Sequence, residues 1–176
     1  MTAMQQRTPE WHTSRIGKIT ASRVGAILGL SPYATPADVM REMVREAHGA
    51  EKEFTGNIAT EWGVKHEADA LADLGNAIGL AIEPGGFHVH PEHNWLAASP
   101  DGICFDFSSG VVEIKCPYNQ KQFDLSTRED YYAQIQIQMA CTGLHYGYFA
   151  VWTPASLSRE LVTADTGWLD RHLPAL

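Results

Sequence analysis

The sequence has no long hydrophobic run and few cysteines. Its longest uncharged apolar stretch near the beginning, VGAILGL, is far shorter than the roughly 20 residues that cross a bilayer, and the segment MTAMQQRTPEW lacks the apolar core of a signal peptide. Cys104, Cys116 and Cys141 form no C-x-x-C pair, which argues against a zinc ribbon or an iron–sulfur site. An odd cysteine count fits reduced thiols in the cytosol. We therefore expect a soluble, cytoplasmic protein with no membrane association.

Positive charge is also scarce. The chain has 13 Lys and Arg against 21 Asp and Glu, a formal net charge of −8. Taken alone, this balance argues against a nucleic-acid-binding protein, because contact with phosphates normally needs a basic surface. The charge is uneven, however: residues 1–23 carry four basic residues and one acid, whereas residues 37–73 carry nine acids and four bases. A local basic site therefore remains compatible with an acidic protein, because a ligand responds to the nearby field.

The first half of the chain has the pattern of helices. Residues 20–29 and 35–49 each begin with a candidate capping residue and end at a glycine, and residues 57–79 form the longest helical pattern. Positions on one face of this third helix are Val64, Glu67, Leu71 and Leu74. This face should be buried, so the sequence predicts a carboxylate on an apolar stripe.

The second half changes to strands after the sequence PGG. Two short strands flank a Pro-Glu-His-Asn turn within residues 87–99, and residues 102–107 and 111–116 are predicted to form a hairpin that turns about Ser109. Later elements are predicted strands over residues 145–152 and 158–164 and a short closing helix over residues 167–173.

One segment between these strands is ambiguous. Residues 131–143 alternate Gln and Ile as a strand does, although their length and closing glycine favour a helix, so both alternatives stay open on the residues alone. The order of the elements predicts an α/β fold, with helices packed on a central mixed sheet. The length of the chain suits one domain over residues 1–176.

The stretch SPDGICFDFSSGVVEIKCP places charges within an apolar strand pattern. Alternate strand residues share a face, so Glu113 and Lys115 point one way and Ile114 points the other. If the hairpin turns about Ser109, Asp101 lies beside Lys115 at one edge of the sheet. Charges in an apolar setting must be paired or bind a cation, and a divalent cation keeps two neighbouring carboxylates ionised. Oxygen ligands of this kind suit Mg²⁺ or Mn²⁺.

Asp101, Glu113 and Lys115 alone leave alternatives open for the kind of site that they form. A D…E-x-K pattern is a weak signal, because a cross-strand salt bridge on a half-exposed strand produces it too. In a metal site, Lys115 either holds the attacking water and stabilises developing charge, or acts as the base after a large fall in its pKa, and we favour the first role. Glu67 is equally compatible with a satisfied carboxylate at the edge of the core.

Several motifs in a fixed order add to this pattern. The segment W-x-x-x-R-x-G-x-I-T-A-S is matched by residues 11–22, Y-x-A-Q-x-Q by residues 131–136, and SPDG and EIKCP surround the acidic residues. The pattern G-x-x-x-E-x-x-A is met by Gly63, Glu67 and Ala70. Together the motifs resemble the phage-type recombination exonucleases, the bacteriophage lambda exonuclease-like, YqaJ viral recombinase family of the PD-(D/E)XK nuclease superfamily.

The resemblance implies a restriction-endonuclease-like core and a role for each matched residue. The implied catalytic residues are Asp101, Glu113, Lys115, Glu67 and Gln134. The implied ligands of two Mg²⁺ ions, for which Mn²⁺ would substitute, are Asp101, Glu113, the Ile114 carbonyl and Glu67. Gln134 would lie on a helix, which assigns the ambiguous segment. The implied site for a DNA 5′-phosphate consists of Arg15 and Ser22, and an arginine fork with a hydroxyl in a first helical turn suits phosphate on general grounds.

The implied activity is metal-dependent 5′-to-3′ digestion of one strand of linear double-stranded DNA, which leaves 3′ overhangs for recombination by strand annealing. The implied partners are DNA ends, a single-strand annealing protein and further copies of the chain in a homotrimer, in the host cytoplasm if a phage or prophage encodes it. Lys121 and Arg128 are candidates for the DNA track. Because family members usually continue beyond the last strands, we expect a compact member or one without a terminal helix.

Two rival functions remain. One is a PD-(D/E)XK endonuclease that cuts internal or branched DNA. The other is a catalytically idle DNA-end-binding module, which the intact set of Asp101, Glu113 and Lys115 argues against. If the motif assignment fails, Arg15 is an ordinary solvated charge and the glutamines after residue 133 are exposed polar positions.

Overall fold

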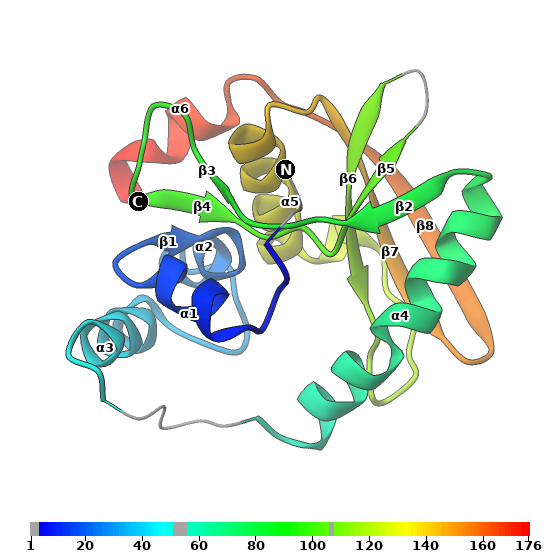
Figure 1. Cartoon of the computed structure of the whole chain (residues 1–176), viewed down its shortest axis with the longest axis horizontal. Coiled ribbons are helices and arrows are strands. Elements are labelled where there is room, and N and C mark those ends of the chain that lie inside the picture. Colours follow the sequence, from blue (N-terminus) through cyan, green and yellow to red (C-terminus); the bar gives the residue numbers. More distant parts are fainter. Residues whose placement is uncertain (1–3, 51–55, 106–107) are drawn as a thin grey trace.

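Five strands form the larger of two β-sheets. The computed structural model describes residues 4–50, 56–105 and 108–176. The strand order is β2-β5-β6-β7-β8, with β6 and β7 parallel and the other neighbours antiparallel. Figure 1 shows this sheet on the side of the molecule away from α1, α2 and α3. The strands are β2 (Ala81–Pro84), β5 (Gly102–Phe105), β6 (Ser109–Lys115), β7 (Tyr146–Thr153) and β8 (Ser156–Thr163).

The smaller sheet has three short strands in the order β1-β4-β3. They are β1 (Ile19–Thr20), β4 (Leu96–Ala98) and β3 (His88–Val89), with β1 parallel to β4. The predicted α/β fold, with helices packed on a central mixed sheet, is confirmed, and the three short strands add a second, smaller sheet. The chain leaves the small sheet after Ala98 and enters the large one at Gly102. Pro100 between them has no amide hydrogen to continue a ladder, so the two sheets separate there.

The helices surround these sheets. They are α1 (Pro9–Arg15), α2 (Ala21–Ile27), α3 (Pro36–Ala47), α4 (Ile58–Ile78), α5 (Glu129–Thr142) and α6 (Trp168–His172), with single turns η1 (Leu125–Thr127) and η2 (Leu173–Ala175). The three helices expected in the first half and the closing helix are confirmed. The sequence analysis did not predict α1, which Thr8 caps through its side chain and which Pro9 begins. No helix in the described ranges is long and apolar enough to cross a membrane.

The ambiguous segment is a helix, α5, and it lies between the two sheets. Its residues Ala133, Ile137 and Cys141 pack in a core with α2 and β4, whereas Ile135 and Met139 pack in another with β6 and β7. A helix buried on two sides does not show a single apolar stripe, which explains why the Gln/Ile alternation resembled a strand. Gly143 ends α5 in the left-handed conformation, with φ 72°.

Helix α4 covers the opposite face of the large sheet. Ala70 and Leu74 are buried there against Val112 of β6 and Ala150 of β7. The predicted apolar stripe is correct only in its second half, because Val64 is 46% exposed. The sheet meets only the later turns of α4, so the first turns project beyond the core (Figure 1).

The hairpin between β5 and β6 sets the register of the charged residues. Phe105 pairs with Ser109 and Gly102 with Val112, so the connection comes before Ser109 and the expected turn about Ser109 is wrong. Ser109 and the glycine after it belong to β6. Along β6, side chains alternate between the α4 core and the α5 core, and this alternation directs the charged residues toward α5.

Candidate active site

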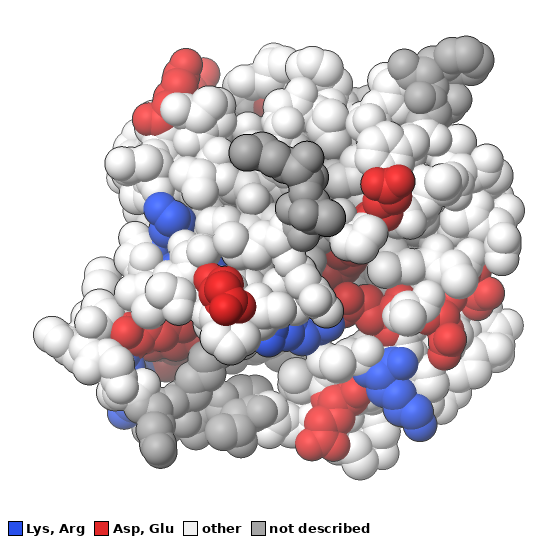
Figure 2. All heavy atoms as spheres, viewed as in Figure 1, with Lys and Arg blue, Asp and Glu red and all other residues white. Residues whose placement is uncertain are grey.

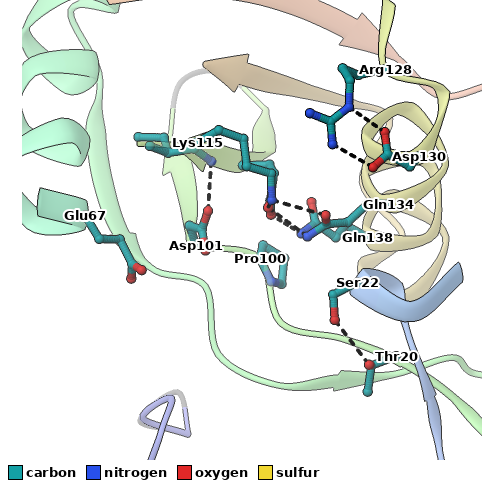
Figure 3. A network of polar contacts seen from close by, with 12 residues as sticks. Thr20, Ser22, Glu67, Pro100, Asp101, Lys115, Arg128, Asp130, Gln134 and Gln138 are labelled. Carbon is teal, nitrogen blue, oxygen red and sulfur yellow. Dashed lines mark hydrogen bonds and ion pairs between the residues drawn. The ribbon is translucent and has the colours of Figure 1, made fainter. Parts of the chain in front are cut away.

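Asp101, Glu113 and Lys115 come together where β5 begins and β6 ends. The carboxylate of Asp101 lies immediately before β5, and its Oδ2 accepts a hydrogen bond of 2.8 Å from the Ile114 amide in β6. Lys115 Nζ lies 2.5 Å from Glu113 Oε1. Glu113 is only 2% exposed. The predicted convergence of two carboxylates and an ammonium is therefore present, and Figure 3 shows the group against α5.

Two glutamines of α5 hold the Glu113 carboxylate. Gln134 Nε2 donates to Glu113 Oε1 at 2.7 Å, and Gln138 Nε2 donates to Oε2 at 2.5 Å. Gln134 Oε1 also accepts a hydrogen bond of 3.3 Å from Lys115 Nζ. Each oxygen of this buried carboxylate thus has a donor, which offsets the cost of burying its charge.

Sequence reasoning assigned no role to Gln138. It is fully buried, whereas the alternative reading placed the glutamines of this segment on an exposed face. Its spacing of four residues from Gln134 was the available signal, because residues four apart share one face of a helix. The Gln138 Oε1 atom is buried and has no hydrogen-bond partner in the described structure.

The charges of this group shift one another's protonation. Burial, followed by the nearby charge of Glu113, raises the pKa of Asp101 well above its usual value, while Lys115 acts in the opposite direction. Burial lowers the pKa of Lys115, but the charges of Glu113, Tyr131 and Asp101 outweigh burial and raise it above its usual value. Lys115 therefore carries its proton in this arrangement, which suits a positioning and charge-stabilising role rather than that of a base.

Glu67 lies apart from the other carboxylates and pairs with an arginine. Its Oε2 lies 2.6 Å from Arg7 Nη2, and in Figure 3 Glu67 is on the α4 side of Asp101. Arg7 belongs to the segment before α1, where Gln6 Nε2 also donates to the Pro100 carbonyl at 2.7 Å. Arg7, Glu67 and Asp101 line one groove. Sequence reasoning did not identify this arginine as part of the site.

Arg15 and Ser22 come together through a residue that sequence reasoning missed. Arg15 Nη2 donates to Thr20 Oγ1 at 3.2 Å, and Thr20 Oγ1 lies 3.4 Å from Ser22 Oγ. The Arg15 guanidinium carbon lies 4.2 Å from the centre of the Trp11 ring. Burial and the charge of Arg23 lower the pKa of Arg15 to about 10.

Arg15 has no carboxylate in ion-pair contact among the residues that the structure describes. Within the described residues no ion pair joins Arg15 to an acid, whereas Arg23 pairs with Glu46 at 2.7 Å. A partly buried cation without a counter-ion favours an anionic ligand.

Among the described residues, the face drawn in Figure 2 shows no continuous basic stripe. On the face in Figure 2, basic side chains form small separate groups, several of them beside acidic ones. Of the two candidates for the DNA track, Arg128 is paired with Asp130 at 2.8 Å and Lys121 is exposed. The scarcity of basic side chains on this face agrees with the formal net charge of −8.

A mixed sheet with an Asp, a Glu and a Lys at the adjoining ends of two strands, backed by a glutamine-bearing helix, is a PD-(D/E)XK-type arrangement. Fold and cluster together define the structural class, that of proteins with a PD-(D/E)XK-like fold. The chain belongs to the family of YqaJ-like viral recombinase domains, whose family model matches residues 10–145.

Solved structures share the fold. An alkaline exonuclease from Laribacter hongkongensis, LHK-Exo, is 27% identical, and in its complex with dAMP it superposes with a TM-score of 0.80 over 96% of this chain and 88% of that one. A phage-related exonuclease from Haemophilus somnus is 15% identical and superposes with a TM-score of 0.70 over 90% of this chain and 89% of that one. The second likeness concerns the fold alone.

Two viral proteins are related in sequence. "Uncharacterized protein R354" of Acanthamoeba polyphaga mimivirus is 23% identical over 78% of this chain, and protein D345L of African swine fever virus is 27% identical over 70% of it. The matched part is 27% of the length of the first protein and 36% of the length of the second.

Proposed function

We propose that this protein is a metal-dependent 5′-to-3′ exonuclease that digests one strand of linear double-stranded DNA from its end and leaves 3′ overhangs for recombination by strand annealing. The observation that carries the proposal is the buried group of Asp101, Glu113 and Lys115 in a chain of this family.

The carboxylates of the site fit a divalent cation. Their oxygens are the ligands that Mg²⁺ and Mn²⁺ prefer. Burial, and then the charge of Glu113, raise the pKa of Asp101, and a cation beside these carboxylates would stabilise their ionised forms. In the described residues, no three His, Cys, Asp or Glu side chains already form a cluster suited to a metal. We propose two Mg²⁺ ions, replaceable by Mn²⁺, held by Asp101, Glu113, the Ile114 carbonyl and Glu67. A bound ion of this kind activates water and neutralises charge on a phosphate oxygen.

The protein's own residues have separate tasks in this proposal. Lys115, protonated and held between Glu113 and Gln134, presents a positive charge to the phosphate that is being hydrolysed. Gln134 and Gln138 fix the orientation of the Glu113 carboxylate. Arg15, Thr20 and Ser22 provide a guanidinium and two hydroxyls for the terminal 5′-phosphate.

A nuclease assay tests this function. Linear duplexes with 5′-phosphoryl or 5′-hydroxyl ends and a covalently closed circle are incubated with and without Mg²⁺. We expect Mg²⁺-dependent release of nucleotides from 5′-phosphorylated linear DNA and no cutting of the circle. Cutting of the circle would favour the endonuclease instead, and inertness on every substrate would leave only an end-binding module.

Replacement of Arg15 with alanine should weaken recognition of the terminal phosphate. Because hydrogen bonds to charged groups contribute about 1.5–3 kcal/mol, the preference for 5′-phosphoryl over 5′-hydroxyl ends should fall by about tenfold or more. The measurement is kcat/KM on both substrates. Arg41→Ala is the matched control, because Arg41 is exposed and pairs with Asp38 on the same helix. An unchanged preference in Arg15→Ala would remove Arg15 from the phosphate site.

Replacement of Arg7 with glutamine should tighten cation binding. The Arg7 guanidinium neutralises Glu67 and so competes with a cation for that carboxylate. An exposed ion pair contributes up to about 1 kcal/mol, so the Kd for Mn²⁺ without DNA, measured by calorimetry, should fall by about two- to fivefold. In a Glu67→Gln background the same replacement should have no effect. A Kd equal to that of the parent protein would show that Arg7 does not compete.

The proposal also includes assembly and partners. We propose a homotrimer that acts on DNA ends in the host cytoplasm, together with a single-strand annealing protein. Sedimentation equilibrium on the full chain tests the homotrimer, and a monomer at all concentrations would contradict it.

A further inference from the structure

Tyr33 is an exposed aromatic side chain on a well-fixed loop. Its residue is 76% exposed, yet the loop between α2 and α3 is held at several points. The Ser31 amide donates to the Gly25 carbonyl at 3.2 Å, and the Tyr33 amide donates to Ser31 Oγ at 3.2 Å. Two residues later, Thr35 and Asp38 form the capping box of α3. The loop therefore presents a large ring to solvent from a defined position.

Arg128 supports this ring from beneath. Its guanidinium carbon lies 5.2 Å from the centre of the Tyr33 ring, and Arg128 Nη1 lies 3.5 Å from the Tyr33 hydroxyl oxygen. Asp130 holds the guanidinium with two hydrogen bonds of 2.9 and 2.8 Å. Figure 3 shows this pair at the beginning of α5, next to Gln134. The two hydrogen bonds to Asp130 hold the Arg128 guanidinium in one orientation, and the carboxylate largely neutralises its charge.

The same contacts continue to the catalytic lysine. The Arg128 guanidinium carbon lies 3.7 Å from the centre of the Tyr131 ring, and Lys115 Nζ lies 4.5 Å from that centre. Tyr33, Arg128, Tyr131 and Lys115 thus form an alternating series of rings and cations that runs from the surface to the candidate active site. No contact in this series is longer than 5.2 Å.

The chemistry of the outer ring suits an unpaired nucleobase. Every base has a π-face, so stacking on a tyrosine is strong and tolerant of sequence. The Arg128 guanidinium behind the ring holds the ring in place, so that its outer face stays available for a base. Phosphate is a poorer ligand here, because Asp130 already neutralises Arg128.

We propose that Tyr33, backed by Arg128, is a stacking site for an unpaired base of the DNA substrate beside the active site. This inference rests on the proposed function, because it requires DNA at Lys115. It assigns the loop between α2 and α3 a role in holding open the end of a duplex, so that a separated strand reaches the carboxylates.

The test compares two duplexes of one length, one fully paired and one with three mismatched terminal pairs. Binding is measured by fluorescence anisotropy in Mg²⁺ with the full chain carrying Asp101→Asn. This replacement removes a carboxylate charge, keeps an oxygen for the Ile114 amide and leaves the Tyr33 series intact. We expect tighter binding of the mismatched duplex. In this background, Tyr33→Ala should remove the preference by lowering the affinity for the mismatched duplex about 5- to 100-fold. Tyr33→Phe should retain the preference.

Phe105→Ala is the matched control, because Phe105 is also an exposed ring, 43% exposed, but is the last residue of β5 and has no contact in the Tyr33 series. If Tyr33→Ala leaves the preference intact, or weakens the binding of both duplexes equally, the proposed stacking site is refuted while the nuclease proposal stands. If the Asp101→Asn protein binds neither duplex, the proposed function and this inference both fail.

Discussion

Replacement of Lys115 with alanine is expected to lower kcat for DNA cleavage by about 10²–10³-fold or more, while the affinity for DNA ends changes little. In the proposed mechanism, Lys115 supplies charge next to the carboxylates and does not anchor the duplex. Loss of one preorganised charge-stabilising donor has an effect of this size in other enzymes. Single-turnover cleavage and anisotropy on the same 5′-phosphorylated duplex measure the two quantities.

The fold should tolerate this replacement, because Gln134 still donates to Glu113 Oε1 after the ammonium is removed. Lys121→Ala is a suitable control, since Lys121 is an exposed lysine outside the cluster. Turnover of the Lys115→Ala variant near the parent rate would refute the assignment of Lys115. Loss of DNA affinity without loss of kcat would make it a binding residue instead.

Replacement of Gly25 with alanine should destabilise the protein. A Cβ atom at Gly25 would lie 2.6 Å from Asp130 Cβ and 2.8 Å from Asp130 Cα, so α2 and the beginning of α5 would have to separate. Overpacking of this kind costs about 1–3 kcal/mol, and each kcal/mol lowers the Tm of a chain of this size by roughly 2–4 °C. Thermal unfolding followed by circular dichroism measures the shift.

Gly63→Ala provides a control with the opposite sign. Gly63 lies inside α4 and a Cβ there would meet nothing within 4 Å. Because alanine is favoured over glycine in a helix by about 1 kcal/mol, the Tm of this variant should rise. If Gly25→Ala is as stable as the parent protein, the close approach of α2 and α5 is not required.

The sequence was most informative where a pattern depends on neighbours along the chain. Capping residues and glycines located α3 and α4, and strand alternation placed Glu113 and Lys115 on one face. These features are set by local geometry, which the residues themselves encode. The role of α5 as a helix followed from the family motif and not from its periodicity, because a helix buried on two sides lacks a single stripe.

The parts that could not be predicted depend on contacts between distant segments. The Arg7–Glu67 pair joins residues 60 positions apart, and nothing near Arg7 in the sequence indicates a partner on α4. Thr20 was considered only as a helix cap, yet its hydroxyl links Arg15 to Ser22. Val64 matched the apolar stripe but is 46% exposed. In each case the contact partner or the exposure of the residue depends on the tertiary arrangement, which the neighbouring residues in the sequence do not determine.

The position of α5 between the two sheets bears on how the protein loses activity. The helix supplies side chains to two hydrophobic cores and also carries both glutamines of the site. Its amide hydrogens should therefore exchange with solvent deuterium only when the whole molecule opens, later than those of α3 at the periphery. Heating should therefore disrupt the candidate active site in one cooperative event, with no intermediate that keeps the site on one intact sheet.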